Sequence, residues 1–130
     1  MEPDRKTPPE LAEVTDELQQ REPIFHRPEN GTSRADFEAM TEIGFWETGA
    51  SGRRYSREFV LQELERRYQR NIKTDDSWET SDFFCQQLAS DLYLLTYTLK
   101  QGNRLTRRST IWRRAGGTWK VVYHQGTVLS

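Results

Sequence analysis

The sequence from Leu92 to Val128 is LYLLTYTLKQGNRLTRRSTIWRRAGGTWKVVYHQGTV. It is rich in β-branched and aromatic residues, and it is divided at Gly102-Asn103 and Gly116-Gly117, which suit two-residue hairpin turns. With a further turn at Ser90-Asp91, the pattern predicts an antiparallel sheet. Four strands are expected, at about 79–88, 92–101, 104–114 and 118–128.

The hairpin turns fix a register for these strands. They place Tyr97 opposite Arg108, Trp112 opposite Val121 and Thr110 opposite Tyr123. Because side chains alternate along a strand, one face then holds Tyr93, Leu95, Tyr97, Leu99, Arg108, Thr110, Trp112, Trp119, Val121, Tyr123 and Gln125. His124 is expected on the opposite face with Ile111 and Val122, and a one-residue bulge would turn it inward.

The N-terminal half has the signals of three helices. Thr7-Pro8-Pro9-Glu10 predicts a capped start, followed by an apolar stripe of Leu11, Val14 and Leu18. Ser33 with Asp36 predicts a second, short helix, and Ser56 a third that ends near Asn71. We therefore expect an α+β fold of three N-terminal helices packed on a curved, mainly antiparallel sheet. Residues 8–130 form a single domain in this prediction, after a flexible tail at 1–7.

Composition limits the classes of protein to which the chain can belong. It has 130 residues, 15.4 kDa, 34% hydrophobic and 30% charged residues, and four tryptophans, which suits one compact domain. No apolar run approaches the ~18–20 residues of a membrane span, and the N-terminus lacks the apolar segment of a signal peptide. Cys85 is the single cysteine. We expect a cytoplasmic protein without membrane contact, metal or cofactor.

Charge is distributed unevenly along the chain. The overall net charge is −1, but no acidic residue follows Asp91, so the last 39 residues carry +7 and the rest −8. This pattern fits a basic surface for an anionic partner, or an acidic first part that packs on a basic second part. The register splits Arg108 and Arg114 from Arg107 and Arg113, so no one-sided basic stripe forms, and nucleic acid is not expected as a partner.

Three segments carry a resemblance to a known family: FWETGASGRRY at 45–55, STIWRR at 109–114 and WKVVYHQGT at 119–127. In the order of these segments along residues 10–128, the chain resembles members of the nuclear transport factor 2-like superfamily. More closely it is similar to the bacterial domain-of-unknown-function 4440 branch, with a SnoaL-like or ketosteroid-isomerase-like fold. The resemblance implies a cone-shaped fold with a pocket at its open end, often in a dimer. The catalytic carboxylate sets of its enzyme members cannot be matched here residue by residue.

An aromatic cavity with a few polar anchors is expected between helices and sheet. Its predicted ligand-binding residues are Trp46, Tyr55, Tyr97, Arg108, Trp112, Tyr123 and Gln125. The buried row Tyr97, Arg108 and Gln125 needs partners, which could be Glu47, Asp82 or a ligand carboxylate or carbonyl oxygen. The Gly49–Arg53 loop is a plain turn or an anion site ahead of a helix.

The function expected is small-molecule binding with an unidentified ligand. The alternative is a cofactor-independent isomerase, dehydratase or hydrolase of a small carbonyl compound, with Asp82 or His124 as the catalytic base. A carboxylate or imidazole that points into the cavity without a bound arginine would favour the alternative. A second alternative is a dimeric association module, in which two copies meet through the face of Ile111, Val122 and His124.

Overall fold

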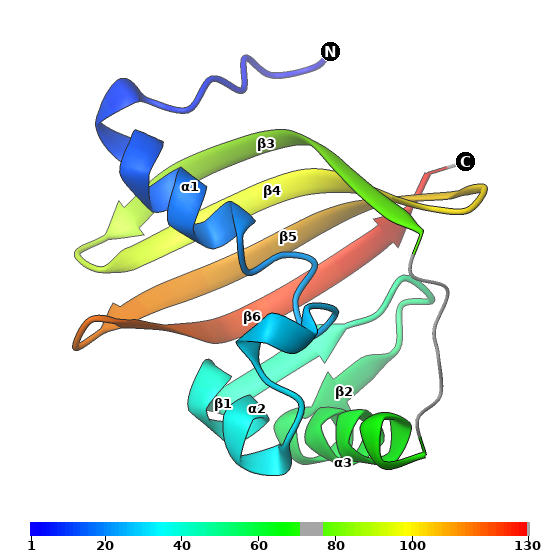
Figure 1. Ribbon diagram of the computed structural model, residues 1–130. Helices are drawn as coiled ribbons and strands as arrows, with labels where there is room; N and C mark the ends of the chain where they lie inside the picture. The colour runs from blue at the N-terminus through cyan, green and yellow to red at the C-terminus, as the bar shows by residue number, and fades with distance from the viewer. Residues whose placement is uncertain (71–76, 130) are drawn as a thin grey trace.

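The computed structural model describes residues 1–70 and 77–129 (Figure 1). In chain order the elements are η1 (Pro9–Leu11), α1 (Ala12–Gln19), η2 (Pro28–Asn30), α2 (Arg34–Met40), β1 (Thr41–Thr48), β2 (Arg54–Ser56), α3 (Arg57–Gln69), β3 (Trp78–Ala89), β4 (Leu92–Gln101), β5 (Arg104–Ala115) and β6 (Thr118–Val128). The four C-terminal strands are confirmed. The helix end expected near Asn71 lies outside the described residues.

One mixed sheet of six strands organises the molecule, in the order β2-β1-β6-β5-β4-β3. Neighbours are antiparallel except for β1 and β6, which are parallel. Figure 1 shows the three α-helices on the same side of the sheet. The α+β prediction is therefore correct, but the helices do not form one N-terminal block. Strands β1 and β2 lie between α2 and α3, because Thr41–Thr48 adds to the edge of the C-terminal meander.

Helix starts follow the predicted caps in two cases out of three. Ser33 and Asp36 form a reciprocal capping box at α2, and the Ser56 side chain accepts a hydrogen bond from the Phe59 N–H at α3. The predicted cap at Thr7 is wrong. The Thr7 hydroxyl instead accepts a 3.0 Å hydrogen bond from the backbone N–H of Cys85, because β3 is an edge strand with unpaired backbone groups.

The hydrophobic core fills the space between the helices and the inner face of the sheet. The predicted stripe of α1 is buried, and so is most of the predicted inner face. The buried members of that face are Tyr93, Leu95, Tyr97, Leu99, Thr110, Trp112, Trp119 and Val121. The pairs Tyr97 with Arg108 and Trp112 with Val121 are confirmed, because short hairpin turns leave little freedom of register.

A bulge in β6 changes the face of its C-terminal half. Trp112 pairs with Val121 but Ile111 pairs with Tyr123, so Val122 is an extra residue. Thr110 consequently lies opposite His124 and not opposite Tyr123, as the unbulged register predicts. The expected inner positions of Tyr123 and Gln125 are therefore wrong, and His124 is on the inner face with 3% exposure.

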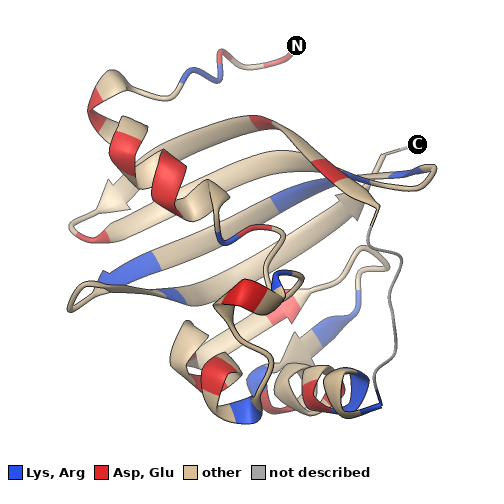
Figure 2. Ribbon diagram, in the orientation of Figure 1, with Lys and Arg blue, Asp and Glu red and all other residues tan. Residues whose placement is uncertain are grey.

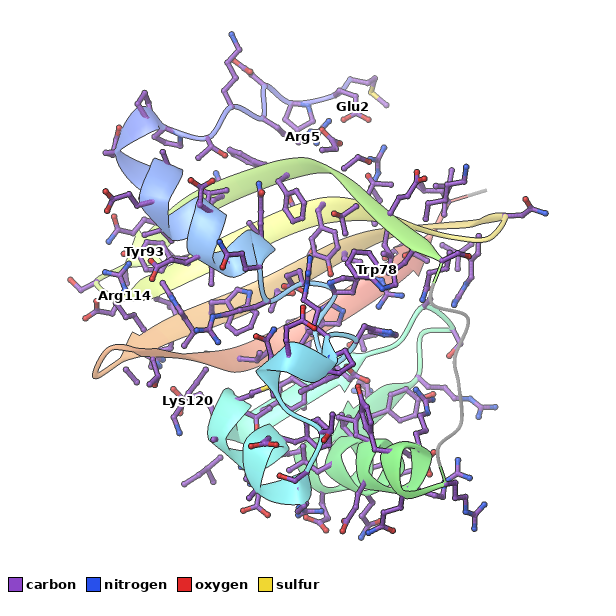
Figure 3. All side chains as sticks on the ribbon, viewed as in Figure 1. Glu2, Arg5, Trp78, Tyr93, Arg114 and Lys120 are labelled. Carbon is purple, nitrogen blue, oxygen red and sulfur yellow. The ribbon has the colours of Figure 1, made fainter. Side chains whose placement is uncertain are left out.

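The uneven charge of the chain is partly matched within the molecule. Figure 2 shows acidic residues along α1 and basic residues on β5. The β5 arginines reach the acidic first part through three ion pairs: Arg113 with Glu42 at 2.9 Å, Arg107 with Asp82 at 3.3 Å and Arg114 with Glu17 at 3.8 Å. Arg114 also lies beside Tyr93, on the inner side (Figure 3). This supports the interpretation of an internally complementary molecule.

No helix among residues 1–70 and 77–129 is both long and apolar enough to cross a membrane.

Candidate functional site

A cavity of about 450 Å³ opens between α3, the segment after α1 and the inner face of the sheet. Apolar side chains from α3 and from the segment after α1 line it together with charged and imidazole groups. The lining residues are Ile24, Phe25, His26, Glu47, Arg53, Tyr55, Phe59, Val60, Glu63, Leu64, Arg67, Arg108 and His124. A volume of this size suits a small organic molecule.

Strand β1 and its two neighbours place three polar side chains in one row. Glu47 pairs with Tyr55 of β2 on one side and with His124 of β6 on the other. Paired residues project to the same face, so these side chains share the inner face. Since α3 begins directly after β2, Phe59 stacks on Tyr55 with 5.1 Å between ring centroids.

Arg108 is a half-buried cation in the wall of this cavity. Its Nε–H donates to Thr106 Oγ1 at 3.0 Å, and Nη1 lies 3.4 Å from His124 Nε2. Among the described residues no carboxylate lies within 4.0 Å of it. Burial lowers the pKa of Arg108 below its ordinary value, which is the expected response of a cation taken out of water.

Glu47 is the carboxylate of the cavity's sheet side. It is half-buried, and within the described part of the chain it makes no hydrogen bond or ion pair with a side chain. Burial raises the pKa of Glu47, and the positive charges of Arg108 and Arg67 oppose that shift. Glu47 can therefore accept a proton from a molecule in the cavity.

His124 links the cavity to a buried carboxyl group. Its Nδ1 lies 2.8 Å from Thr110 Oγ1, and Thr110 hydrogen-bonds in turn to Glu22. Burial lowers the pKa of His124 to about 3, with a further contribution from the Arg108 charge. The imidazole is therefore neutral near pH 7.

Glu22 is fully buried at the far end of this chain of contacts. It accepts hydrogen bonds from the Tyr97 hydroxyl at 2.7 Å, the Trp112 indole at 3.1 Å and the Ile24 N–H at 3.0 Å. Burial raises its pKa, and these hydrogen bonds and that of Thr110 oppose the shift. Sequence reasoning assigned the partner of Tyr97 to Glu47, Asp82 or a ligand and missed Glu22. The available signal was spacing, because Glu22 follows Leu18 by four residues and continues the apolar stripe.

Comparison with solved structures identifies the fold. No family model and no curated protein matches the chain. An NTF2-like protein from Cytophaga hutchinsonii is similar, with a TM-score of 0.67 and 14% identity over 88% of this chain and 97% of that one. A Parabacteroides distasonis protein provisionally named a ketosteroid isomerase is also similar. Its TM-score is 0.68, and the identity is 13% over 97% of this chain and 96% of that one. The chain has an NTF2-like fold.

This NTF2-like fold also occurs in an Exiguobacterium sibiricum protein provisionally named a calcium/calmodulin-dependent kinase II association domain. It has a TM-score of 0.62 and 16% identity, over 100% of this chain and 98% of that one. Identities this low establish the fold alone, because one fold hosts many functions. The narrower resemblance to the domain-of-unknown-function 4440 branch is not confirmed.

Within the NTF2-like fold, the seven predicted ligand-binding residues fall into three places. Tyr55 and Arg108 line the cavity. Tyr97 and Trp112 share the inner face but turn toward Glu22 in the core. The other three predicted residues, Trp46, Tyr123 and Gln125, lie on the outer face.

The outer position of these three residues corrects the predicted cavity. The Trp46 and Tyr123 rings are 4.6 Å apart, and the Tyr123 hydroxyl contacts Thr48 at 2.7 Å and Gln125 at 2.9 Å. The reason is alternation: Glu47 points inward, so Trp46 points outward, and the bulge at Val122 moves Tyr123 and Gln125 to the same side.

The two predicted catalytic residues are separated by the sheet. His124 lines the cavity, whereas Asp82 is outside it, where its carboxylate pairs with Arg5 at 2.7 Å and with Arg107 at 3.3 Å. Figure 3 shows Arg5 on the N-terminal tail beyond the edge of the sheet. Asp82 is therefore a surface ion-pair partner in this fold.

The Gly49–Arg53 loop forms a turn, and Cys85 is a buried core residue. In the loop, the Gly49 N–H donates to Arg53 O at 2.8 Å and the Gly52 N–H to Gly49 O at 2.9 Å, so these two amides close a turn. Cys85 is fully buried beneath α1, and burial raises its thiol pKa. The described residues contain no group of three His, Cys, Asp or Glu side chains that could hold a metal ion.

Proposed function

We propose that the chain binds a small molecule in the cavity beside α3, with an oxygen-bearing group at Arg108. The observation that carries this proposal is Arg108 itself, a half-buried cation in the cavity wall without an acidic partner among the described residues. A ligand oxygen supplies that partner. The apolar part of the ligand packs on the side walls, which comprise Ile24, Phe25, Phe59, Val60 and Leu64.

The test is a fragment screen by NMR that follows the imidazole resonances of His26 and His124, both in the cavity wall. We expect binders to shift both resonances in the wild type and to lose that effect in Arg108→Gln. Arg107→Gln is the matched control, because the neighbouring side chain points to the other face of β5 and bonds to Thr98 at 2.7 Å. Binders that behave alike in the two variants would place the ligand elsewhere.

A second candidate function is cofactor-independent proton transfer on a small carbonyl compound, as in an isomerase or dehydratase. It is favoured by Glu47, a carboxylate in the cavity wall with no ion pair among the described residues. Glu47 abstracts a proton next to the carbonyl, and Arg108 stabilises the negative charge that develops on the oxygen. His124 is the poorer base, because both ring nitrogens are engaged and burial lowers its pKa to about 3.

Deuterium exchange tests this candidate. Acetophenone and phenylpyruvate are incubated with the protein in deuterium oxide, and exchange next to the carbonyl is followed by NMR. Exchange that is faster than the buffer background and disappears in Glu47→Gln supports catalysis. If a compound binds in the cavity but exchanges at the background rate, the protein binds it without catalysis.

Self-association through the outer face is also part of the proposal. A row of apolar side chains crosses four strands there in register, from Trp46 through Tyr123 and Ile111 to Leu94. A second copy is the proposed cover for this row, since such rows of exposed apolar groups mark interaction sites. His124, which was expected on this face, is not part of it because it points inward.

A further inference from the structure

Arg108 has only neutral partners, unlike the arginines of the described chain that form ion pairs. Seven arginines of the described chain pair with a carboxylate, at distances between 2.7 and 3.8 Å: Arg5, Arg27, Arg34, Arg66, Arg107, Arg113 and Arg114. The described partners of Arg108 are neutral, a threonine hydroxyl and an imidazole. A cation held in a half-buried position by neutral groups keeps most of its unbalanced charge.

The guanidinium is held so that one edge remains free. Nε and one N–H of Nη1 are occupied by Thr106 and His124, which leaves the second N–H of Nη1 and both of Nη2. Gly126 lies against the flat face, because a Cβ there would be only 3.4 Å from Cζ and Nε of Arg108. Arg108 is among the residues that line the cavity, and no described hydrogen bond occupies Nη2.

The contacts behind Arg108 fix the hydrogen positions. Arg108 can only donate, so His124 Nε2 accepts, and the neutral ring carries its proton on Nδ1. Nδ1–H then donates to Thr110, whose hydroxyl proton goes to Glu22. Every member of this Arg108–His124–Thr110–Glu22 chain is satisfied in one arrangement, which holds the free edge of Arg108 in place.

The lining as a whole carries one unbalanced positive charge. It contains three arginines, Arg53, Arg67 and Arg108, and two glutamates, Glu47 and Glu63. Burial lowers the pKa of both His26 and His124, so neither adds charge near pH 7. Glu63 is also paired with Arg66, at 2.8 Å, so the positive charges of the cavity exceed its free negative ones. An anionic ligand reduces this excess, whereas a neutral ligand does not.

We propose, resting on the binding function above, that the oxygen-bearing group of the ligand is a carboxylate, held edge-on by Nη1 and Nη2 of Arg108. The two oxygens of a carboxylate match two parallel N–H groups of a guanidinium, as in a bidentate arginine–carboxylate pair. A ketone or amide oxygen occupies one donor and leaves the charge unbalanced.

The experiment uses matched pairs of probes: benzoate, phenylacetate and naphthoate, each against its primary amide. Binding to the wild type is titrated by NMR at the His26 and His124 resonances. Because charge-assisted hydrogen bonds are worth more than neutral ones, we expect each acid to bind about tenfold more tightly than its amide, or better. In Arg108→Gln the ratio falls to about one, and in the control Arg107→Gln it is kept.

Each outcome either supports or overturns the carboxylate assignment. Amides that bind in the cavity as tightly as the acids overturn the carboxylate assignment and leave the binding function standing. Probes that shift neither histidine in any protein overturn both. If Arg108→Gln does not fold, Arg108→Lys takes its place: a point charge without the planar fork keeps some acid preference but weakens it by several-fold, and an unchanged ratio contradicts edge-on binding.

Discussion

The Tyr97 hydroxyl donates a 2.7 Å hydrogen bond to the Glu22 carboxyl group, although 75 positions separate the two residues in the sequence. Glu22 also accepts from the Ile24 N–H, so the same carboxyl group fixes the segment after α1 that forms one wall of the cavity. The core and the candidate site therefore share one polar anchor. Substitutions at Glu22 or Tyr97 should therefore change both the free energy of unfolding and the affinity for a ligand in the cavity.

Tyr97→Phe tests the anchor directly. Removing the hydroxyl leaves a fully buried carboxyl group with one donor fewer, which should lower the free energy of unfolding by about 1–3 kcal/mol. Urea denaturation measures the change. Tyr123→Phe is the control: its hydroxyl bonds at the half-exposed outer face, and its loss should cost less than about 1 kcal/mol. Equal losses in the two variants would contradict the special role of the buried pair.

The proton position on His124 is a separate prediction. The neutral ring should carry its proton on Nδ1 in the wild type and in Thr110→Ser, which keeps the hydroxyl acceptor. Thr110→Val removes that acceptor and should shift the ring toward the other tautomer. Ring nitrogen and carbon chemical shifts distinguish the two forms. A proton on Nε2 in the wild type would break the proposed chain from Arg108 to Glu22.

Acid should destabilise the protein through His124. Its pKa in the folded protein is about 3, below the ordinary 6.5, so below pH 6.5 the unfolded chain takes up a proton that the folded chain does not. The free energy of unfolding therefore falls as the pH falls, by up to about 1.4 kcal/mol per pH unit for one such proton. His124→Gln removes this contribution. The wild type should lose about 1.6 kcal/mol relative to the variant between pH 6.5 and 5; parallel pH profiles would contradict burial of a neutral ring.

The hairpins were predictable from the sequence because a two-residue turn determines which residues face each other. The bulge at Val122 was not, since VVYHQ contains no glycine or proline to mark it and Val121 points inward in either register. Glu22 was missed for a different reason. A buried carboxyl group is stable only through donors such as Tyr97 and Trp112, which lie far away in the sequence and meet it only in the fold.

The outer apolar row leads to a prediction about association. Trp46 is 43% exposed at one end of the row, and a glutamate there would place a charge in the proposed contact between two copies. We expect light scattering at micromolar concentration to give a dimer for the wild type and a monomer for Trp46→Glu. Leu88→Glu is the control, an equally exposed apolar position on β3 at the other edge of the sheet. A monomeric wild type would remove the proposed self-association.

Glu47 should impose opposite pH dependences on catalysis and on carboxylate binding. As a base it must be ionised, so exchange of the protons next to a carbonyl should speed up as the pH rises through its pKa, which burial raises above the ordinary 4.5. The same negative charge repels a carboxylate bound at Arg108, so affinity for benzoate should fall over the same range. Two variants test this assignment. Glu47→Gln should abolish exchange and make the affinity for benzoate independent of pH over this range. Asp82→Asn, at a surface ion pair outside the cavity, should change neither property. A benzoate affinity that falls with pH in Glu47→Gln as steeply as in the wild type would assign the titration to another group.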